Sequence, residues 1–399
     1  MRIAFLTTEY VSENYFAGGI ANYLSRAASA LRREGHEPEI FTLSHEQERI
    51  RHEEVMVHRV TPGTLKTKVS ATRYIWRYEG YAEAFGDAWR LAAALRRRHE
   101  EIPFDIVQAA NYRACGLLAT LRKPAPVVTR ISSYEPLWRE AYKRPATAGQ
   151  LQFERAEMIQ MRRSSALYAP SKLLAETLRQ KEGLAVHVIE PPFRFDGQLA
   201  GDSLPQSLAP ETYALFFGNI GYAKGCDRLL KVLPALLERN AGMKFVFVGD
   251  ADKTEEGQPF DQHLRESLAR YADRVEVLPA QRHAQLLPII RHARFVALPS
   301  KIDNLPNTCL EAMALKRIVI GTQGASFDQL IRHGASGFLV SQSDDDDLAA
   351  RMEQVWRMDA QERERIGAEA ALSLERLKPE HAIKRLVAFY EEVISGTKH

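Results

Sequence analysis

Residues 191–212 read PPFRFDGQLAGDSLPQSLAPET, a stretch with four prolines and two glycines that interrupts the chain near its middle. Prolines and glycines at this density end regular elements and are typical of a linker between domains. On both sides of this stretch, short runs rich in Val and Ile alternate with helical patterns. Such alternation favours βα units built around a parallel sheet. The 399 residues therefore predict two α/β domains.

The alternation places the expected elements on both sides of the linker. Before it, we expect strands at RIAFLTT (2–8), EIFTL (39–43), FDIVQAA (104–110), PVVTRI (126–131), ALYAP (166–170) and VHVIE (186–190). After it, strands are expected at YALFFG (213–218), KFVFVGD (244–250), RVEVLP (274–279), RFVALPS (294–300) and RIVIGT (317–322), with helices at 225–239, 260–271, 284–292, 307–315, 345–357, 360–375 and 379–394.

These elements predict four parts of the chain. They are an N-terminal Rossmann-like domain over 1–195, a linker over 196–212, a second Rossmann-like domain over 213–378 and a terminal helix over 379–399. For the terminal helix we consider packing back on the first domain. Both domains are expected to be doubly wound and to face a central cleft, with ligands at the carboxyl ends of the strands.

The composition excludes several classes of protein. With 45% hydrophobic and 26% charged residues, the chain is neither disordered nor a coiled coil. No apolar run approaches the length of a membrane-spanning helix, and MRIAFLTTEY at the start is typical of a first strand. The three cysteines (Cys115, Cys226, Cys309) form no disulfide or metal pattern, which favours a reducing, cytoplasmic location.

The net charge of +3 is too small to indicate a nucleic-acid partner. Basic residues outnumber acidic ones by six over residues 1–200, however, and the helical segment 70–99 ends in three arginines. A peripheral contact with the inner face of a membrane, or an anionic acceptor, is one interpretation. Because acidic residues are interspersed along this segment, we prefer a solvated helix with internal ion pairs.

Three segments could bind a ligand. Gly18 and Gly19 lie between the first strand and the first helix, where a phosphate can approach the backbone. Lys224 ends the glycine-rich stretch 218–225 at the start of a helix, although this stretch lacks the pattern of a Walker loop. The densest segment, 299–314, has two carboxylates, Asp303 and Glu311, around a helix start near Pro306. Carboxylates accept hydrogen bonds from sugar hydroxyls, and a helix start stabilises a diphosphate.

The chain resembles the family 4 retaining glycosyltransferases, which have the GT-B fold. The resemblance is carried by DNLPNTCLEAMALKRIVIGTQGASFDQLIRHGASGFLV (303–340), by LFFGNIGYAKGCDRLLKVLPALL (215–237) and KFVFVGD, and more loosely by TTEYVSENYFAGGIANYLSRAASALRREGHEPEIFTL (7–43). It implies a hexosyltransferase that moves a sugar from a nucleotide-diphosphate sugar, with UDP or GDP expected, to a hydroxyl acceptor. Retention by front-face attack, with no metal or other cofactor, and a role in polysaccharide or glycoconjugate synthesis are further implications.

The resemblance also assigns residues. It implies that Glu311 holds the ribose, that Asp303 contacts the donor sugar and that Lys224 binds the diphosphate. Asp303, Lys224 and Glu311 would be the catalytic group. The wider donor set is Gly18, Gly19, Asn219, Asn304, Leu305 and Asn307, the base would lie near Ala280 and Arg282, and the acceptor near Tyr10, Ser132, Ser133 and Tyr134.

Four positions depart from the family pattern. Asn219 stands where the family usually has Arg, so a cationic contact to the diphosphate is missing or is supplied by Arg228 or Arg282. Asp303 is one methylene shorter than the usual Glu. Ser132 or Ser133, and Gln108, stand where histidines are common, and these side chains cannot carry positive charge.

Two alternatives to sugar transfer stay open. One is a nucleotide-sugar epimerase or hydrolase of the same fold, and the other is a catalytically silent homologue that acts as a binding partner. The acidic run Asp344–Asp347 could suggest a metal site. It precedes a helical pattern, however, so N-capping is the preferred interpretation.

Overall fold

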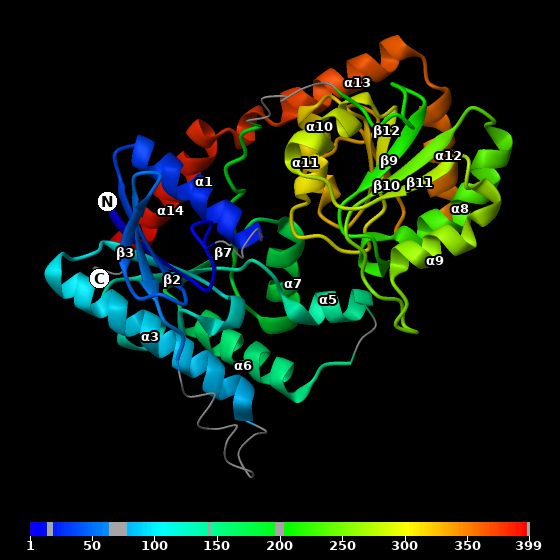
Figure 1. Ribbon diagram of the computed structural model, residues 1–399. Coiled ribbons are helices and arrows are strands. Elements are labelled where there is room, and N and C mark those ends of the chain that lie inside the picture. Colours follow the sequence, from blue (N-terminus) through cyan, green and yellow to red (C-terminus); the bar gives the residue numbers. More distant parts are fainter. Residues whose placement is uncertain (14–18, 64–77, 143–144, 196–202, 397–399) are drawn as a thin grey trace. The chain divides into compact units, whose positions relative to one another are not determined.

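The computed structural model describes residues 1–13, 19–63, 78–142, 145–195 and 203–396 (Figure 1). It divides into two compact units. The N-terminal unit comprises Met1–Arg139, Arg144–Phe193 and Leu377–His399, and the C-terminal unit comprises Glu140–Lys143 and Arg194–Arg376.

The N-terminal unit is built on an eight-stranded sheet in the order β3-β4-β2-β1-β5-β6-β7-β8. All neighbouring pairs are parallel except β3 with β4. The strands are β1 (Arg2–Thr7), β2 (Glu37–Leu43), β3 (Arg49–His52), β4 (Val55–Val60), β5 (Ile106–Ala110), β6 (Val127–Arg130), β7 (Ala166–Ala169) and β8 (His187–Val188). The central strands are buried along nearly their whole length, as parallel strands covered on both faces must be.

Helices cover both faces of this sheet. On one face α3 (Glu79–Glu101), α4 (Leu117–Arg122) and α6 (Ala148–Arg163) pack against one another. On the other, α1 (Gly19–Arg33) packs against α14 (Pro379–Gly396), as Figure 1 shows. The remaining helices are α5 (Glu135–Tyr142) and α7 (Lys172–Glu182).

The C-terminal unit has a six-stranded, all-parallel sheet in the order β11-β10-β9-β12-β13-β14. This is the strand order of a dinucleotide-binding Rossmann fold, with the order reversing between β9 and β12. The strands are β9 (Tyr213–Phe217), β10 (Lys244–Val248), β11 (Val275–Leu278), β12 (Phe295–Leu298), β13 (Val319–Thr322) and β14 (Phe338–Val340). Its helices are α8 (Cys226–Arg239), α9 (Phe260–Ser267), α10 (His283–His292), α11 (Asn307–Ala314), α12 (Asp345–Arg357) and α13 (Ala360–Ser373).

The terminal helix α14 belongs to the N-terminal unit. Its Ile383, Leu386, Phe389 and Tyr390 are buried in a core that also holds Ile3 and Phe5 of β1 and residues of α1. The Tyr390 hydroxyl donates to Oε1 of Gln108 on β5 at 2.5 Å, and the Tyr168 hydroxyl donates to the same oxygen at 2.5 Å. Gln108, where the resemblance would place His, therefore links β5 to β7 and α14 through buried hydrogen bonds.

The sequence did not predict the hairpin formed by β3 and β4. Its turn residues, Glu53 and Glu54, both have positive φ, at 45° and 67°. Turns of this kind usually carry Asn or Gly, so the sequence gives no turn signal here. The short strand β14 was also not anticipated.

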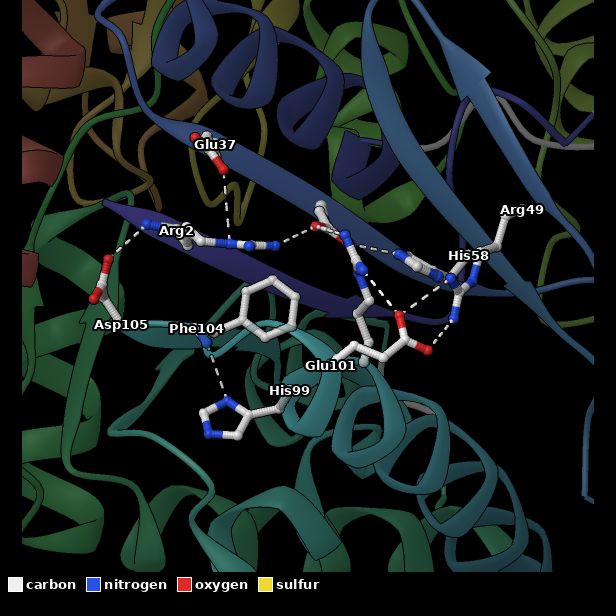
Figure 2. A network of polar contacts seen from close by, with 10 residues as sticks. Arg2, Glu37, Arg49, His58, His99, Glu101, Phe104 and Asp105 are labelled. Atoms are coloured by element: carbon white, nitrogen blue, oxygen red, sulfur yellow. Dashed lines mark hydrogen bonds and ion pairs between the residues drawn. The ribbon is translucent and has the colours of Figure 1, made fainter.

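A buried carboxylate joins β2 to β1, β4 and α3 (Figure 2). Glu39 on β2 is 6% exposed. It accepts hydrogen bonds from Arg2 at 2.7 Å, from His58 at 2.7 Å, and from two nitrogens of Arg98 at 2.9 Å each. Burial by itself would raise the pKa of Glu39, but the hydrogen bonds from His58 and Arg98 outweigh it and lower the pKa to about 2.

We expect Glu39→Gln to lower the free energy of unfolding at neutral pH by about 3 kcal/mol, because it removes the buried carboxylate that pairs with Arg2 and Arg98. A lowered carboxyl pKa stabilises the fold above the unfolded value of 4.5 and loses that effect as the pH falls toward about 2. The difference between wild type and variant, measured by urea denaturation, should therefore shrink across this interval. Glu37→Gln is the matched control, since Glu37 is 62% exposed at its side chain. A pH-independent difference would contradict the assignment.

Candidate functional site

The loops that follow β9 and β12 meet at one edge of the C-terminal sheet. These strands are neighbours at the point where the strand order reverses, which is where open α/β sheets bind ligands. The backbone N–H of Lys301 donates to the carbonyl of Ala223 at 2.9 Å and so joins the two loops. Gly225 has a φ of 74°, and a Cβ there would lie 1.9 Å from the carbonyl oxygen of Pro299. Only glycine fits this approach.

This approach brings Lys224 against Asp303. The Lys224 Nζ lies 2.5 Å from Oδ2 of Asp303, with the two side chains 24% and 12% exposed. The other Asp303 oxygen accepts from the backbone N–H of Asn304 at 3.0 Å, and the Asp303 carbonyl accepts from the hydroxyl of Ser326 at 2.9 Å. Two residues that lie 79 positions apart in the sequence thus form one charged pair.

The amino end of α11 lies beside this pair. A Cβ on Gly218, in the loop after β9, would lie 3.4 Å from Cγ2 of Thr308 in the first turn of α11. The N-cap residue Pro306 supplies no side-chain cap, and the first turn has no acidic residue. Within the described chain, no hydrogen bond is recorded for the backbone N–H groups of Leu305, Asn307 and Thr308. The helix therefore offers unpaired donors and positive potential to an anion.

The segment from 303 to 311 thus brings together the predicted donor-binding residues. Glu311, half-buried, lies in the second turn of α11, on the helix that carries the unpaired N–H groups. Together the loop and helix hold Asp303, Asn304, Leu305, Asn307 and Glu311.

Arg228, one of the two arginines considered for the cationic contact missing at Asn219, binds other groups of the C-terminal unit. Arg228 is 3% exposed, and its guanidinium donates to Asp345 at 2.8 Å and to the carbonyls of Ser341 and Asp344 at 2.9 and 2.8 Å. These bonds tie α8 to the start of α12, so Arg228 has a structural role. Asn219 itself lies half-exposed in the loop after β9.

Arg282 and Ala280 lie after β11, the edge strand of the sheet. Both are exposed, and Arg282 is the N-cap residue of α10. Because β11 is separated from β9 by β10, a ligand at the Lys224–Asp303 pair would have to extend across β10 to reach them. Their role toward the base stays a prediction.

In the N-terminal unit, the start of α1 is already occupied by a protein carboxylate. Glu9 is 5% exposed, and its Oε1 accepts from the backbone N–H of Ala21 at 3.3 Å. Burial raises the pKa of Glu9 to about 6, although the bonds from the Ala21 and Ile20 backbone oppose it. Gly19, the first residue of α1, is therefore a weaker candidate for binding a diphosphate than the amino end of α11. Gly18 lies outside the described residues.

Two predicted acceptor residues point into the protein. Tyr10 is 1% exposed and packs edge-on against His52. Tyr134 is 8% exposed, and its hydroxyl donates to Glu182 at the end of α7 at 2.6 Å. Both side chains are buried in the N-terminal unit, and a contact with an acceptor stays a prediction.

Ser132 and Ser133, after β6, are better placed. Asn111, which directly follows β5, fixes them both, because its Oδ1 accepts from the Ser132 N–H at 2.8 Å and its Nδ2 donates to the Ser133 carbonyl at 2.8 Å. Ser133 lines a cavity of about 440 Å³ together with Tyr112, Arg113 and Glu157. Asn111 was missed from the sequence, although a polar residue directly after a buried strand was a usable signal.

The acidic run at 344–347 caps a helix, as predicted. Asp344 accepts from the N–H of Asp347 at 3.0 Å at the start of α12. Among the described residues, no group of three or more His, Cys, Asp or Glu side chains is arranged to hold a metal ion. No described helix is long and apolar enough to cross a membrane. At the end of α3, Arg98 is committed to Glu39 and Glu101 while Arg96 and Arg97 are exposed, and a peripheral membrane contact stays a prediction.

Comparison with known proteins indicates the family of the chain. Residues 17–194 match the model for Glycosyltransferase Family 4, and residues 211–358 match that for glycosyl transferases group 1. Relatives include D-inositol 3-phosphate glycosyltransferases from Rhodococcus opacus, 25% identical over 94% of this chain and 85% of the relative, and from Mycobacterium marinum, 26% identical over 92% and 78%. The Nocardiopsis dassonvillei enzyme of that name is 29% identical over 44% of this chain, a match that spans less than half of the relative's length, 42%.

Solved structures share the fold along the whole chain. Sucrose-phosphate synthase from Thermosynechococcus elongatus superimposes with a TM-score of 0.73 at 15% identity, over 99% of both chains. Anabaena Alr3699/HepE in complex with UDP and glucose gives 0.70 at 17% identity, over 98% of this chain and all of that one. The two matched models leave out residues 1–16, which include β1, residues 195–210 and residues 359–399. The chain belongs to the family 4 glycosyltransferases and has their GT-B fold of two Rossmann-like domains.

Proposed function

We propose that the protein transfers a hexose from a nucleotide-diphosphate sugar to a hydroxyl acceptor, with retention of the anomeric configuration. One observation carries the proposal, namely that the Lys224 ammonium lies 2.5 Å from Asp303 beside the uncapped amino end of α11. An ammonium and a helix start together favour a diphosphate, while the carboxylate beside them favours sugar hydroxyls.

The donor binds to the C-terminal unit in this proposal. Its diphosphate lies against Lys224 and the N–H groups of Leu305, Asn307 and Thr308. The carboxylate of Glu311, within the same helix, accepts from the two ribose hydroxyls. UDP is the preferred nucleotide, with GDP as the alternative, because the structurally similar Anabaena protein was solved with UDP-glucose.

The chemistry follows from where negative charge develops. As the bond between the anomeric carbon and the diphosphate oxygen breaks, charge collects on the leaving diphosphate. Lys224 and the α11 donors stabilise it, and each such contact is worth about 2.7–4 kcal/mol in other enzymes. The acceptor hydroxyl attacks from the same face, forms the new glycosidic bond and passes its proton to the leaving phosphate oxygen. Neither a protein base nor a metal ion is part of this proposal.

The N-terminal unit binds the acceptor in this proposal. Ser132 and Ser133 follow β6 at the carboxyl edge of the sheet, held by Asn111, and the cavity lined by Ser133 gives an acceptor room to bind. Hydroxyl groups at this edge suit the recognition of a polar, sugar-like molecule.

Lys224→Met should lower the rate of nucleotide release from a nucleotide sugar by about 10²–10³-fold, since it removes a cation from the leaving group. Release of UDP is measured with the acceptor supplied as a panel of glycosides. Lys231→Met is the control, because Lys231 is 66% exposed on α8 and contacts only the carboxylate of Asp345 among the described contacts. Equal rates for wild type and Lys224→Met would refute the proposed role.

Glu311→Gln should weaken the binding of UDP by about tenfold and leave the binding of inorganic pyrophosphate unchanged, because a carboxylate accepts from hydroxyls more strongly than an amide does. Isothermal titration calorimetry with both ligands separates the two effects. Wild-type protein should also prefer UDP over its 2′,3′-dideoxy analogue, and the variant should lose this preference. A Glu311→Ala variant that retained full biological function would instead favour the catalytically silent homologue.

A further inference from the structure

Two arginines are buried among the described residues, and they differ in one respect. Arg228 is 3% exposed and pairs with the carboxylate of Asp345 at 2.8 Å. Arg130, the last residue of β6, is 7% exposed, and no ion pair with a carboxylate of the described chain is recorded for it. The partly buried arginines Arg2, Arg59, Arg98, Arg317 and Arg363 have such partners, whereas Arg294, also partly buried, donates to two backbone carbonyls.

Neutral groups hold the Arg130 guanidinium in place. Its Nη1 donates to the hydroxyl of Ser132 at 2.7 Å, and its Cζ lies 3.7 Å from the centre of the Tyr23 ring. The Tyr23 hydroxyl is 2.8 Å from that of Tyr168. Burial raises the pKa of both tyrosines, so neither phenol ionises to act as a counter-ion.

An unpaired buried charge is unfavourable to folding, and proteins usually pair or replace it. Beside this position, Val128 of β6 and Ile106 of β5 are fully buried apolar residues, and Tyr23, Tyr168 and Gln108 contribute uncharged polar groups. These polar neighbours form hydrogen bonds but supply no negative charge. The retained cation calls for an anion supplied from outside the chain.

The position suits a ligand. Arg130 ends β6 and is in register with Ala110, which ends β5, so it lies at the carboxyl edge of a parallel sheet. The Ser132 hydroxyl beside it is fixed through the Ser132 N–H, which Asn111 holds at 2.8 Å. A guanidinium has five N–H donors in a planar fork that matches phosphate and carboxylate oxygens. The Ser132 hydroxyl accepts from one of them, and the Tyr23 hydroxyl also contacts the guanidinium.

We propose that Arg130 and the Ser132 hydroxyl bind an anionic group, a phosphate monoester or a carboxylate, that is carried by the acceptor. This inference rests on the proposed function, in which the N-terminal unit binds the acceptor. It makes the enzyme selective for acidic acceptors and gives Arg130 a specificity role that is separate from the stabilisation of the leaving group by Lys224.

The test uses the full chain and isothermal titration calorimetry with inorganic phosphate and with acetate. Arg130→Met should weaken the binding of the preferred anion by about tenfold or more, as expected when a charged hydrogen-bond donor is lost. Arg130→Lys should have intermediate affinity, since it keeps the charge but not the fork. Arg122→Met, at an exposed position on α4, should bind like wild type. Comparison of phosphate with acetate distinguishes the two anions.

Thermal unfolding separates binding from a structural role. If Arg130 is kept for a ligand, Arg130→Met should unfold at the same temperature as wild type or at a higher one, because an uncompensated charge has been removed. A lower unfolding temperature, or a variant that does not fold, would mean that the cation supports the fold and would overturn the proposal. Wild-type protein that binds neither anion would overturn it as well.

The donor site is tested separately. Lys224→Met should lose affinity for UDP and keep the Arg130-dependent binding of the anion, while Arg130→Met should keep its affinity for UDP. If UDP displaces the anion from Arg130, the group belongs to the donor and the acceptor assignment fails. If Arg130→Met binds the anion like wild type while Lys224→Met loses UDP, this inference fails and the proposed function stands.

Discussion

The approach of Gly225 to the carbonyl of Pro299 is the constraint on which the candidate site depends. With a φ of 74° and no room for a Cβ, this glycine lets the loop after β9 lie directly on the loop after β12. Lys224 then reaches Asp303, and Gly218 lies beside Thr308 at the start of α11. The two loops lie side by side because β9 and β12 are neighbours in the sheet. The glycine allows their backbones to approach closely. A side chain at position 225 would separate the Lys224 ammonium from the start of α11.

Buried charge is treated in three different ways in this protein. Glu39 pairs with Arg2 and Arg98, and hydrogen bonds from His58 and Arg98 lower its pKa to about 2. Arg228 has one carboxylate and two carbonyls, which commit it to the contact between α8 and α12. Arg130 has an aromatic face and a hydroxyl. The first two arrangements pair the buried charge with groups of the chain itself and explain local structure. In the third arrangement, no carboxylate of the described chain forms an ion pair with the guanidinium.

The sequence predicted what local patterns determine. Hydrophobic runs located most strands, and the cap at Asp344 followed from an acidic run before a helical pattern. The pattern of residues 299–316 correctly predicted the end of a strand, a loop and a helix. The features that the sequence did not reveal depend on contacts between distant segments. The turn at Glu53 and Glu54 carries no turn residues, and nothing near Arg228 in the sequence reveals that its partner is Asp345. Tyr10 follows a strand as a ligand-binding residue would, but its ring is buried in the core.

Lys224 and Arg130 differ in their exposure to solvent and in whether a carboxylate pairs with them. This difference affects how each side chain would bind an anion. Lys224 is about a quarter exposed and already paired, so an arriving diphosphate must share the ammonium with Asp303. The positive end of α11 offsets that competition, which makes the lysine and the helix start depend on each other. Arg130 is already desolvated and has no competing carboxylate in the described chain. An anion there meets a preorganised donor, so the same charge discriminates more sharply between ligands.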